Sequence, residues 1–121
     1  MKTVNYKDAD RVNNPHGVDA RKLHENEYVQ VVHIHLKAGE CLKKHTTPVD
    51  VFFYVLEGEG IVKIGDEKLM VCRDMLVESP KDIPHCLYNE SSGDFRVLVV
   101  KTPGPTQEQN KQAFRSMISS K

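Results

Sequence analysis

The 121-residue chain has no excess of charge of either sign. Its 17 lysines and arginines equal its 17 aspartates and glutamates, so the formal net charge is zero. Proteins that bind nucleic acid or an anionic membrane surface need basic patches to neutralise phosphates. The basic residues here are scattered, and a pair such as Lys43-Lys44 is too short to follow a phosphate backbone. We therefore expect neither a nucleic-acid partner nor a membrane partner.

The chain also lacks long hydrophobic runs and paired cysteines. No apolar run approaches the roughly 20 residues that cross a bilayer. The first six residues turn polar before the apolar region of a signal peptide could form. Cys41, Cys72 and Cys86 are an odd number without the CxxC spacing of a metal site. Reduced cysteines in or near a core are typical of cytosolic proteins, so we expect a cytoplasmic location.

Helical periodicity is missing from most of the chain, and short β-rich runs take its place. The length suits one domain, which we divide into an N-terminal arm (1–26), a β-barrel (27–102) and a helical tail (103–121). One short strand is expected in the arm at 20–23, and Gly65-Asp66 suits a tight hairpin turn. Further strands are expected at 28–37, 41–45, 51–56, 61–64, 68–72, 75–78, 85–89 and 95–101. Short strands at this frequency, without helices between them, indicate an all-β sandwich or barrel.

The run at 51–56 is apolar at every position. A strand with one solvated face would alternate between polar and apolar residues, so we expect both faces of this strand to be buried. One face can pack inside the barrel, and the other needs a cover. A homodimer partner is the simplest cover, and the N-terminal arm is the alternative.

The tail differs from the rest of the chain. Thr106 and Gln109 fit a capping box, which opens a helix. Apolar residues follow at helical spacing and are expected to pack on the barrel: Ala113, Phe114, Met117 and Ile118. The expected fold is thus all-β with a short C-terminal helix.

Two segments carry glycine, proline, histidine and asparagine at a fixed spacing. The residues in question are Gly39, His45, Gly58, Pro80, His85 and Asn89. Their order and spacing resemble the two-motif signature of the cupin superfamily, over about residues 29–100. Asp74 and Asp82 stand where that signature has two further glycines. The resemblance implies a double-stranded β-helix, also called a jelly roll or cupin barrel, with the motif residues facing the barrel mouth.

The same resemblance implies a divalent metal in the barrel mouth, held by three histidines and one glutamate. Only His45 and His85 match these ligand positions, where Thr47 and Val51 replace the other histidine and the glutamate. A catalytic metal generally needs three protein ligands, so two imidazoles alone would hold an ion weakly. One divalent ion (Fe, Mn, Ni, Cu or Zn) on His45 and His85 is therefore retained only as an alternative.

Two further side chains are candidates to complete such a site. Asp50 offers a carboxylate, but strand alternation points it away from position 51 unless a bulge intervenes. Cys41 shares its parity with His45, so its thiolate could approach the site. Cys86 should point away from the face of its neighbour His85.

The remaining polar candidates have structural interpretations. His33 and His35 project from one strand face without a third ligand in register, so we expect surface or dimer-interface positions. His16 and His24 lie in the polar arm and carry no functional signal. Asn89 is expected to tie a turn through its amide.

Three kinds of function are compatible with this pattern. The first is a small-molecule-binding cupin, ligand unknown, whose apolar and polar pocket residues are Val51, Phe53, Val55, His45, Thr47 and His85. The second is a cupin enzyme, either a metal-dependent oxygenase or a metal-free isomerase or epimerase-like catalyst. In such an enzyme His45 or His85 would be the general base. The third is an interaction protein whose dimer surface matters more than its pocket.

Overall fold

The computed structural model describes residues 1–103, whose regular structure is almost entirely β-strand. A short 3₁₀ helix, η1 (Tyr6–Asp8), precedes the strands. The strands are β1 (Asp19–Glu25), β2 (Gln30–Leu36), β3 (Cys41–His45), β4 (Asp50–Glu57), β5 (Glu59–Ile64), β6 (Glu67–Cys72), β7 (Leu76–Ser79), β8 (His85–Tyr88) and β9 (Phe95–Thr102). No helix in residues 1–103 is long and apolar enough to cross a membrane. The helix expected within the tail lies outside the described residues.

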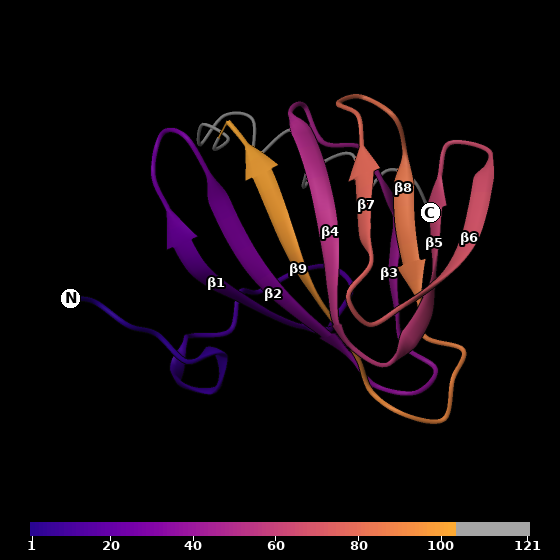
Figure 1. Cartoon of the computed structure of the whole chain (residues 1–121), viewed down its shortest axis with the longest axis horizontal. Helices are drawn as coiled ribbons and strands as arrows, with labels where there is room; N and C mark the ends of the chain where they lie inside the picture. Colours follow the sequence, from indigo (N-terminus) through magenta and orange to yellow (C-terminus); the bar gives the residue numbers. More distant parts are fainter. Residues whose placement is uncertain (104–121) are drawn as a thin grey trace.

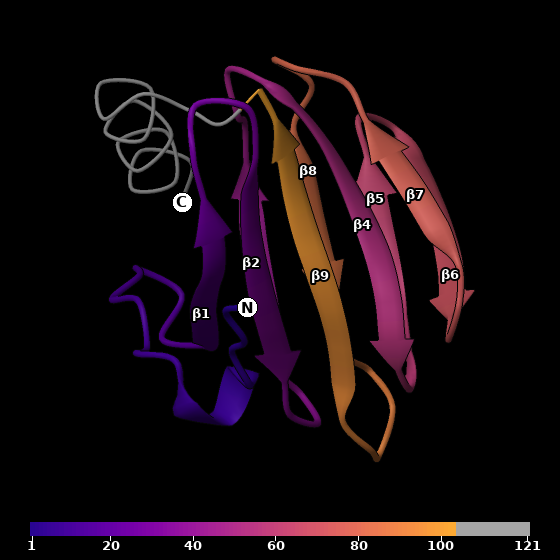
Figure 2. The ribbon, with the colours of Figure 1, turned by 60° about the vertical axis from the view of Figure 1, so that its left-hand side comes forward.

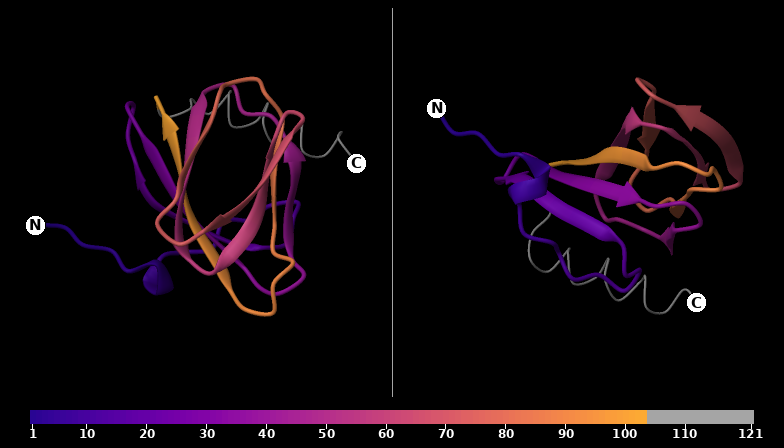
Figure 3. Two further views of the ribbon diagram at one scale, coloured as in Figure 1. Left: turned by 45° about the vertical axis from the view of Figure 1, so that its right-hand side comes forward. Right: turned by 90° about the horizontal axis from the view of Figure 1, so that it is seen from below.

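The strands of residues 1–103 form two antiparallel sheets. One has the order β1-β2-β9-β4-β7, and the other has the order β3-β8-β5-β6. The two sheets face each other, and the views in Figures 1 and 2 show the chain crossing repeatedly between them. Figure 3 shows the resulting jelly roll from two further directions. The all-β expectation is confirmed, and the two-sheet arrangement fits a double-stranded β-helix.

Side-chain alternation along β4 fixes which face turns toward the core. Val51, Phe53 and Val55 point inward and are almost fully buried. The opposite face, which carries Phe52 and Tyr54, is only half-buried. Burial of the inner face is confirmed, and within residues 1–103 the outer face is covered only in part, so its full burial by a partner subunit stays a prediction.

At several motif positions the backbone adopts the left-handed conformation, with a positive φ angle. Gly39 and Gly58 have φ angles of 85° and 80°, and a Cβ on Gly58 would lie 2.0 Å from the carbonyl oxygen of Asp94. Asp74 and Asp82 have φ angles of 73° and 64°. Aspartate tolerates this region better than most residues with a side chain. The two positions where aspartate replaces a motif glycine thus keep the conformation that favours glycine.

The N-terminal arm folds against the outer face of the five-stranded sheet. The Tyr6 ring stacks on the His33 ring with centroids 3.9 Å apart, and the Arg96 guanidinium lies 4.7 Å from the Tyr6 centroid. Arg21 donates hydrogen bonds to the carbonyls of Tyr6 and of two neighbouring residues. His33 is consequently 1% exposed. The expectation that His33 lies at the surface or at a dimer interface was wrong, because the chain's own arm covers it.

Candidate functional site

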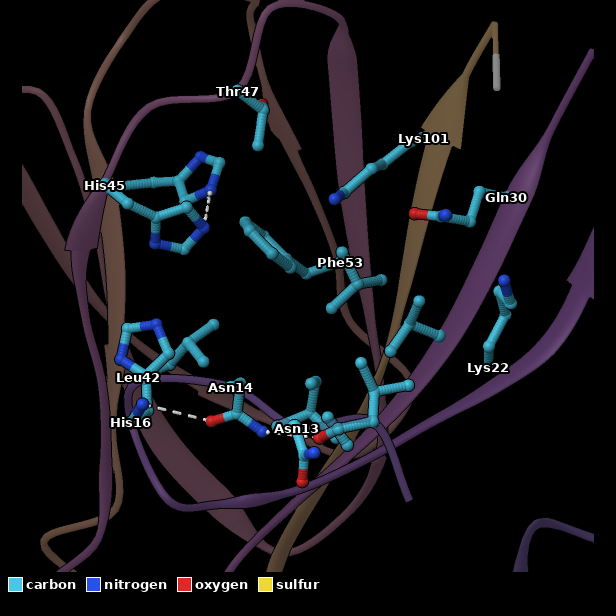
Figure 4. A pocket seen from close by; sticks show the side chains of 16 residues that line it. Asn13, Asn14, His16, Lys22, Gln30, Leu42, His45, Thr47, Phe53 and Lys101 are labelled. Carbon is cyan, nitrogen blue, oxygen red and sulfur yellow. Dashed lines mark hydrogen bonds between the residues drawn. The ribbon is translucent and has the colours of Figure 1, made fainter. Parts of the chain in front are cut away.

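A cavity of about 360 Å³ lies between the two sheets (Figure 4). Its apolar wall is formed by Ala20, Val32, Ile34, Leu42, Phe53 and Val99, among others. Polar side chains form the rest of the lining, including Asn13, Asn14 and Thr47. On one side lie histidines from the arm, β3 and β8; on the other lie Lys22, Gln30 and Lys101 from β1, β2 and β9.

Four of the six pocket residues expected from the sequence line this cavity. They are His45, Thr47, Phe53 and His85. Val51 and Val55 share the inward face of β4 with Phe53, but they belong to the hydrophobic core and do not line the cavity. The strand alternation that brings Phe53 to the cavity therefore also buries its two neighbours on that face beside it.

His45 and His85 form a hydrogen-bonded pair across β3 and β8, where they are directly opposite each other. Their Nε2 atoms lie 3.2 Å apart. His45 Nδ1 lies 2.9 Å from the carbonyl oxygen of Lys43, and His85 Nδ1 lies 2.8 Å from Ser79 Oγ. Each of the four ring nitrogens thus has a hydrogen-bond partner within the protein.

The Lys43 carbonyl determines the donor-to-acceptor direction of the hydrogen bonds that link His45, His85 and Ser79. A carbonyl oxygen only accepts, so Nδ1 of His45 carries the proton and its Nε2 is the acceptor in the neutral ring. His85 must then donate from Nε2, which leaves its Nδ1 to accept from the Ser79 hydroxyl. Each group thus donates to the next: Ser79 donates to His85, and His85 donates to His45.

Burial keeps these histidines neutral near pH 7. Desolvation, followed by the nearby His45 and Lys101, lowers the pKa of His85 to about 3. Desolvation also lowers the pKa of His45, although its hydrogen bond to Lys43 opposes the shift. The neutral rings carry no fixed charge, and each of their four nitrogens already has a hydrogen-bond partner.

His16 is a cavity residue that the sequence did not single out. Its ring centroid lies 5.7 Å from that of His45, and its Nδ1 accepts a hydrogen bond of 2.8 Å from the Lys43 amide. Asn14 shapes the turn that carries His16 by accepting from the His16 amide. The docking of this turn on β3 is a long-range contact with no local signal in the sequence. The expectation that His16 carries no functional role therefore missed its place at the cavity.

The donor set around the histidine pair does not fit a catalytic metal. Asp50 is exposed, and its carboxylate accepts from the Lys81 amide instead. The register of β3 shifts between Leu42 and His45, so these two residues both point inward and Cys41 does not line the cavity. The parity argument for Cys41 was therefore wrong. Within residues 1–103, no three histidine, cysteine, aspartate or glutamate side chains form a group able to hold a metal ion.

Residues 32–101 match the sequence model of a family described as a cupin domain. The match spans more than half of the chain. The chain belongs to the cupin family. A search of curated proteins finds no match for this cupin.

Solved structures similar to this cupin share its fold. The protein TT1209 from Thermus thermophilus is 29% identical, with a TM-score of 0.74 over 87% of this chain and 100% of that chain. KdgF from a Halomonas species is 16% identical, with a TM-score of 0.76 over 89% of this chain and 97% of that one. An RmlC-like cupin from Shewanella frigidimarina is 15% identical, with a TM-score of 0.76 over 89% and 95%. The last two similarities concern the fold alone.

Proposed function

We propose that this cupin binds a small molecule in the cavity between its two sheets. The observation that carries the proposal is a cavity of about 360 Å³ whose lining combines apolar side chains with polar ones. Small-molecule sites typically have volumes of about 300–1,000 Å³ and combine apolar walls with polar groups that orient the ligand. His45, Thr47 and His85 supply polar groups beside the aromatic ring of Phe53.

The lowered pKa values of His45 and His85 favour ligand binding over general-base catalysis. A general base works best when its pKa lies near the working pH. The pKa of His85 is about 3, and that of His45 is also lowered by burial. The pair is therefore better suited to contacting a ligand as neutral rings than to taking its proton.

The alternative function is a cupin enzyme. The metal-free isomerase or epimerase-like version would need His45 or His85 to break its hydrogen bond to the other before taking a proton from a ligand. The metal-dependent oxygenase would need a third ligand beside His45 and His85. Among residues 1–103, no third histidine, cysteine, aspartate or glutamate completes such a group with them.

A fragment titration tests the binding proposal. Toluene, phenol, benzamide and benzoate are titrated into ¹⁵N-labelled protein, and amide shifts are followed by NMR. We expect at least one probe to bind saturably in the wild type and to lose binding in Val32→Phe, which fills the cavity. Val4→Phe is the matched control, because Val4 is 53% exposed in the arm. Binding by no probe, or binding that survives in Val32→Phe, would contradict the proposal.

Metal analysis tests the oxygenase alternative. We expect purified protein to hold no stoichiometric Fe, Mn, Ni, Cu or Zn, and chelation to leave its melting temperature unchanged. A stoichiometric metal that is lost in the double variant His45→Ala, His85→Ala would instead support the enzyme.

We further propose that this cupin works in the reducing cytoplasm. Cys41, Cys72 and Cys86 are all free thiols, as expected where disulfides do not form. Thiol titration of freshly purified, denatured protein should find three reactive groups, and fewer would argue against a reducing compartment.

A further inference from the structure

Lys101 is a largely buried cation at the cavity. It lies on β9, the central strand of the five-stranded sheet, between Gln30 of β2 and Val51 of β4. Its side chain enters the cavity across from the histidines (Figure 4). In the part of the chain that the structure describes, no hydrogen bond or ion pair is found for its Nζ.

The other lysine at the cavity has a different environment. Lys22 is half-exposed, and its Nζ lies 3.2 Å from a carboxylate oxygen of Glu25. That carboxylate group also accepts a hydrogen bond from Gln30. Glu25 is thus already held by two partners and acts on Lys101 only as a nearby charge.

No acidic side chain among residues 1–103 pairs directly with Lys101. Burial lowers the pKa of Lys101, and Glu25 opposes this shift only in part. Its charge reaches across the cavity, where it lowers the pKa of both His45 and His85. No aspartate or glutamate among residues 1–103 lines the cavity. A buried ammonium without a counter-charge is costly, and an anionic ligand would remove that cost.

We infer that the ligand is a small molecule with an apolar body and a carboxylate group, and that this carboxylate pairs with Lys101 Nζ. The inference rests on the proposed binding function and adds the ligand's chemical class to it. The apolar body lies along Phe53 and Val99, and the neutral histidines face the end opposite the carboxylate. One unpaired ammonium matches the single charge of a carboxylate.

The test compares benzoate with benzamide, which have nearly the same shape and differ in charge. Dissociation constants are measured by NMR titration at constant ionic strength. We expect benzoate to bind wild-type protein about tenfold more tightly or better, the range of a hydrogen bond to a charged group. Lys101→Met should remove this preference while benzamide binding stays, and Lys101→Gln gives the same readout if the methionine variant does not fold.

Two controls make the assignment specific to Lys101. Lys22→Met changes the other cavity lysine, and Lys68→Met makes the same change of net charge on the exposed face of β6. Both should keep the preference for benzoate. A preference that disappears in Lys22→Met or Lys68→Met, or that survives in the Lys101 variants, overturns the inference.

Failure of this inference is separable from failure of the binding function. Equal affinities for benzoate and benzamide in the wild type overturn the carboxylate inference and leave the binding function intact. If none of toluene, phenol, benzamide and benzoate binds, the binding function fails, and the inference fails with it.

Discussion

At the scale of single residues, His85 links the barrel wall to the cavity. Its Nδ1 accepts from Ser79, and its Nε2 donates to His45. Ser79 is 1% exposed and His85 is 2% exposed, so water cannot easily replace either partner. The ring is therefore held in one orientation by two hydrogen bonds.

Removing the Ser79 hydroxyl tests this arrangement. Ser79→Ala should lower the free energy of unfolding by about 1–3 kcal/mol, because it leaves a buried imidazole nitrogen without a donor. Urea denaturation gives the measurement, and Ser92→Ala in an exposed turn is the control. A Ser79 variant as stable as the control would show that the hydrogen bond does not hold the ring.

The motif spacing identified only some residues of the site. It placed His45 and His85 at the cavity, and it gave Asn89 a structural role that the structure confirms. The buried Asn89 amide donates to the carbonyls of Leu36 and Gly93. Lys101 was not found, because a lysine at the end of an apolar strand has the same local pattern whether its side chain turns inward or outward.

At the scale of elements, the backbone conformation of the turns matches the family motif even where the residue type differs from it. Asp82 adopts φ 64° at a position where the family signature has glycine. The hairpin at Gly65-Asp66 also forms as its sequence indicates, with Ile64 opposite Glu67. The bulge in β3 was not predictable, because the pairing of β3 with β8 sets it, and no glycine marks it.

Substitutions at Asp82 test the role of this backbone conformation. Asp82→Gly should be tolerated or slightly stabilising, whereas Asp82→Val should lower the free energy of unfolding by about 1–2 kcal/mol, since a side chain is strained in the left-handed region. Thermal or urea unfolding of the matched pair gives the comparison. Equal stability of the two variants would mean that the turn relaxes to another conformation.

At the scale of the whole molecule, buried histidines make stability depend on pH. The pKa values of His16, His33 and His85 are about 4, 4 and 3, mainly because of burial. The unfolded chain binds protons at these sites near the ordinary value of about 6.5. Between these values the unfolded state binds more protons than the folded state, so folding becomes less favourable as the pH falls.

We therefore expect the urea midpoint to fall steadily as the pH is lowered from about 6.5 to about 4. His33→Gln should flatten this dependence by removing one of the histidines whose pKa is lowered by burial. His24→Gln, an exposed histidine, should leave it unchanged. A midpoint that stays constant across this window would contradict the neutral, buried state of these histidines.

We also propose that the molecule is a homodimer. Exposed apolar side chains on β6 and β7 favour this proposal, since Leu69, Met70 and Leu76 are each more than half exposed. Size-exclusion chromatography with light scattering should give about twice the 13.8 kDa of one chain at micromolar concentration. A clean monomer at that concentration would refute the dimer.

The most direct test of the cavity function is a long-range ¹H–¹⁵N NMR spectrum of the histidine side chains during a benzoate titration. We predict saturable shifts of the His45 and His85 ring nitrogens, with the His24 signals unchanged. Ring signals of His45 and His85 that stay in place throughout the titration, or that move no more than those of His24, would contradict ligand binding in the cavity.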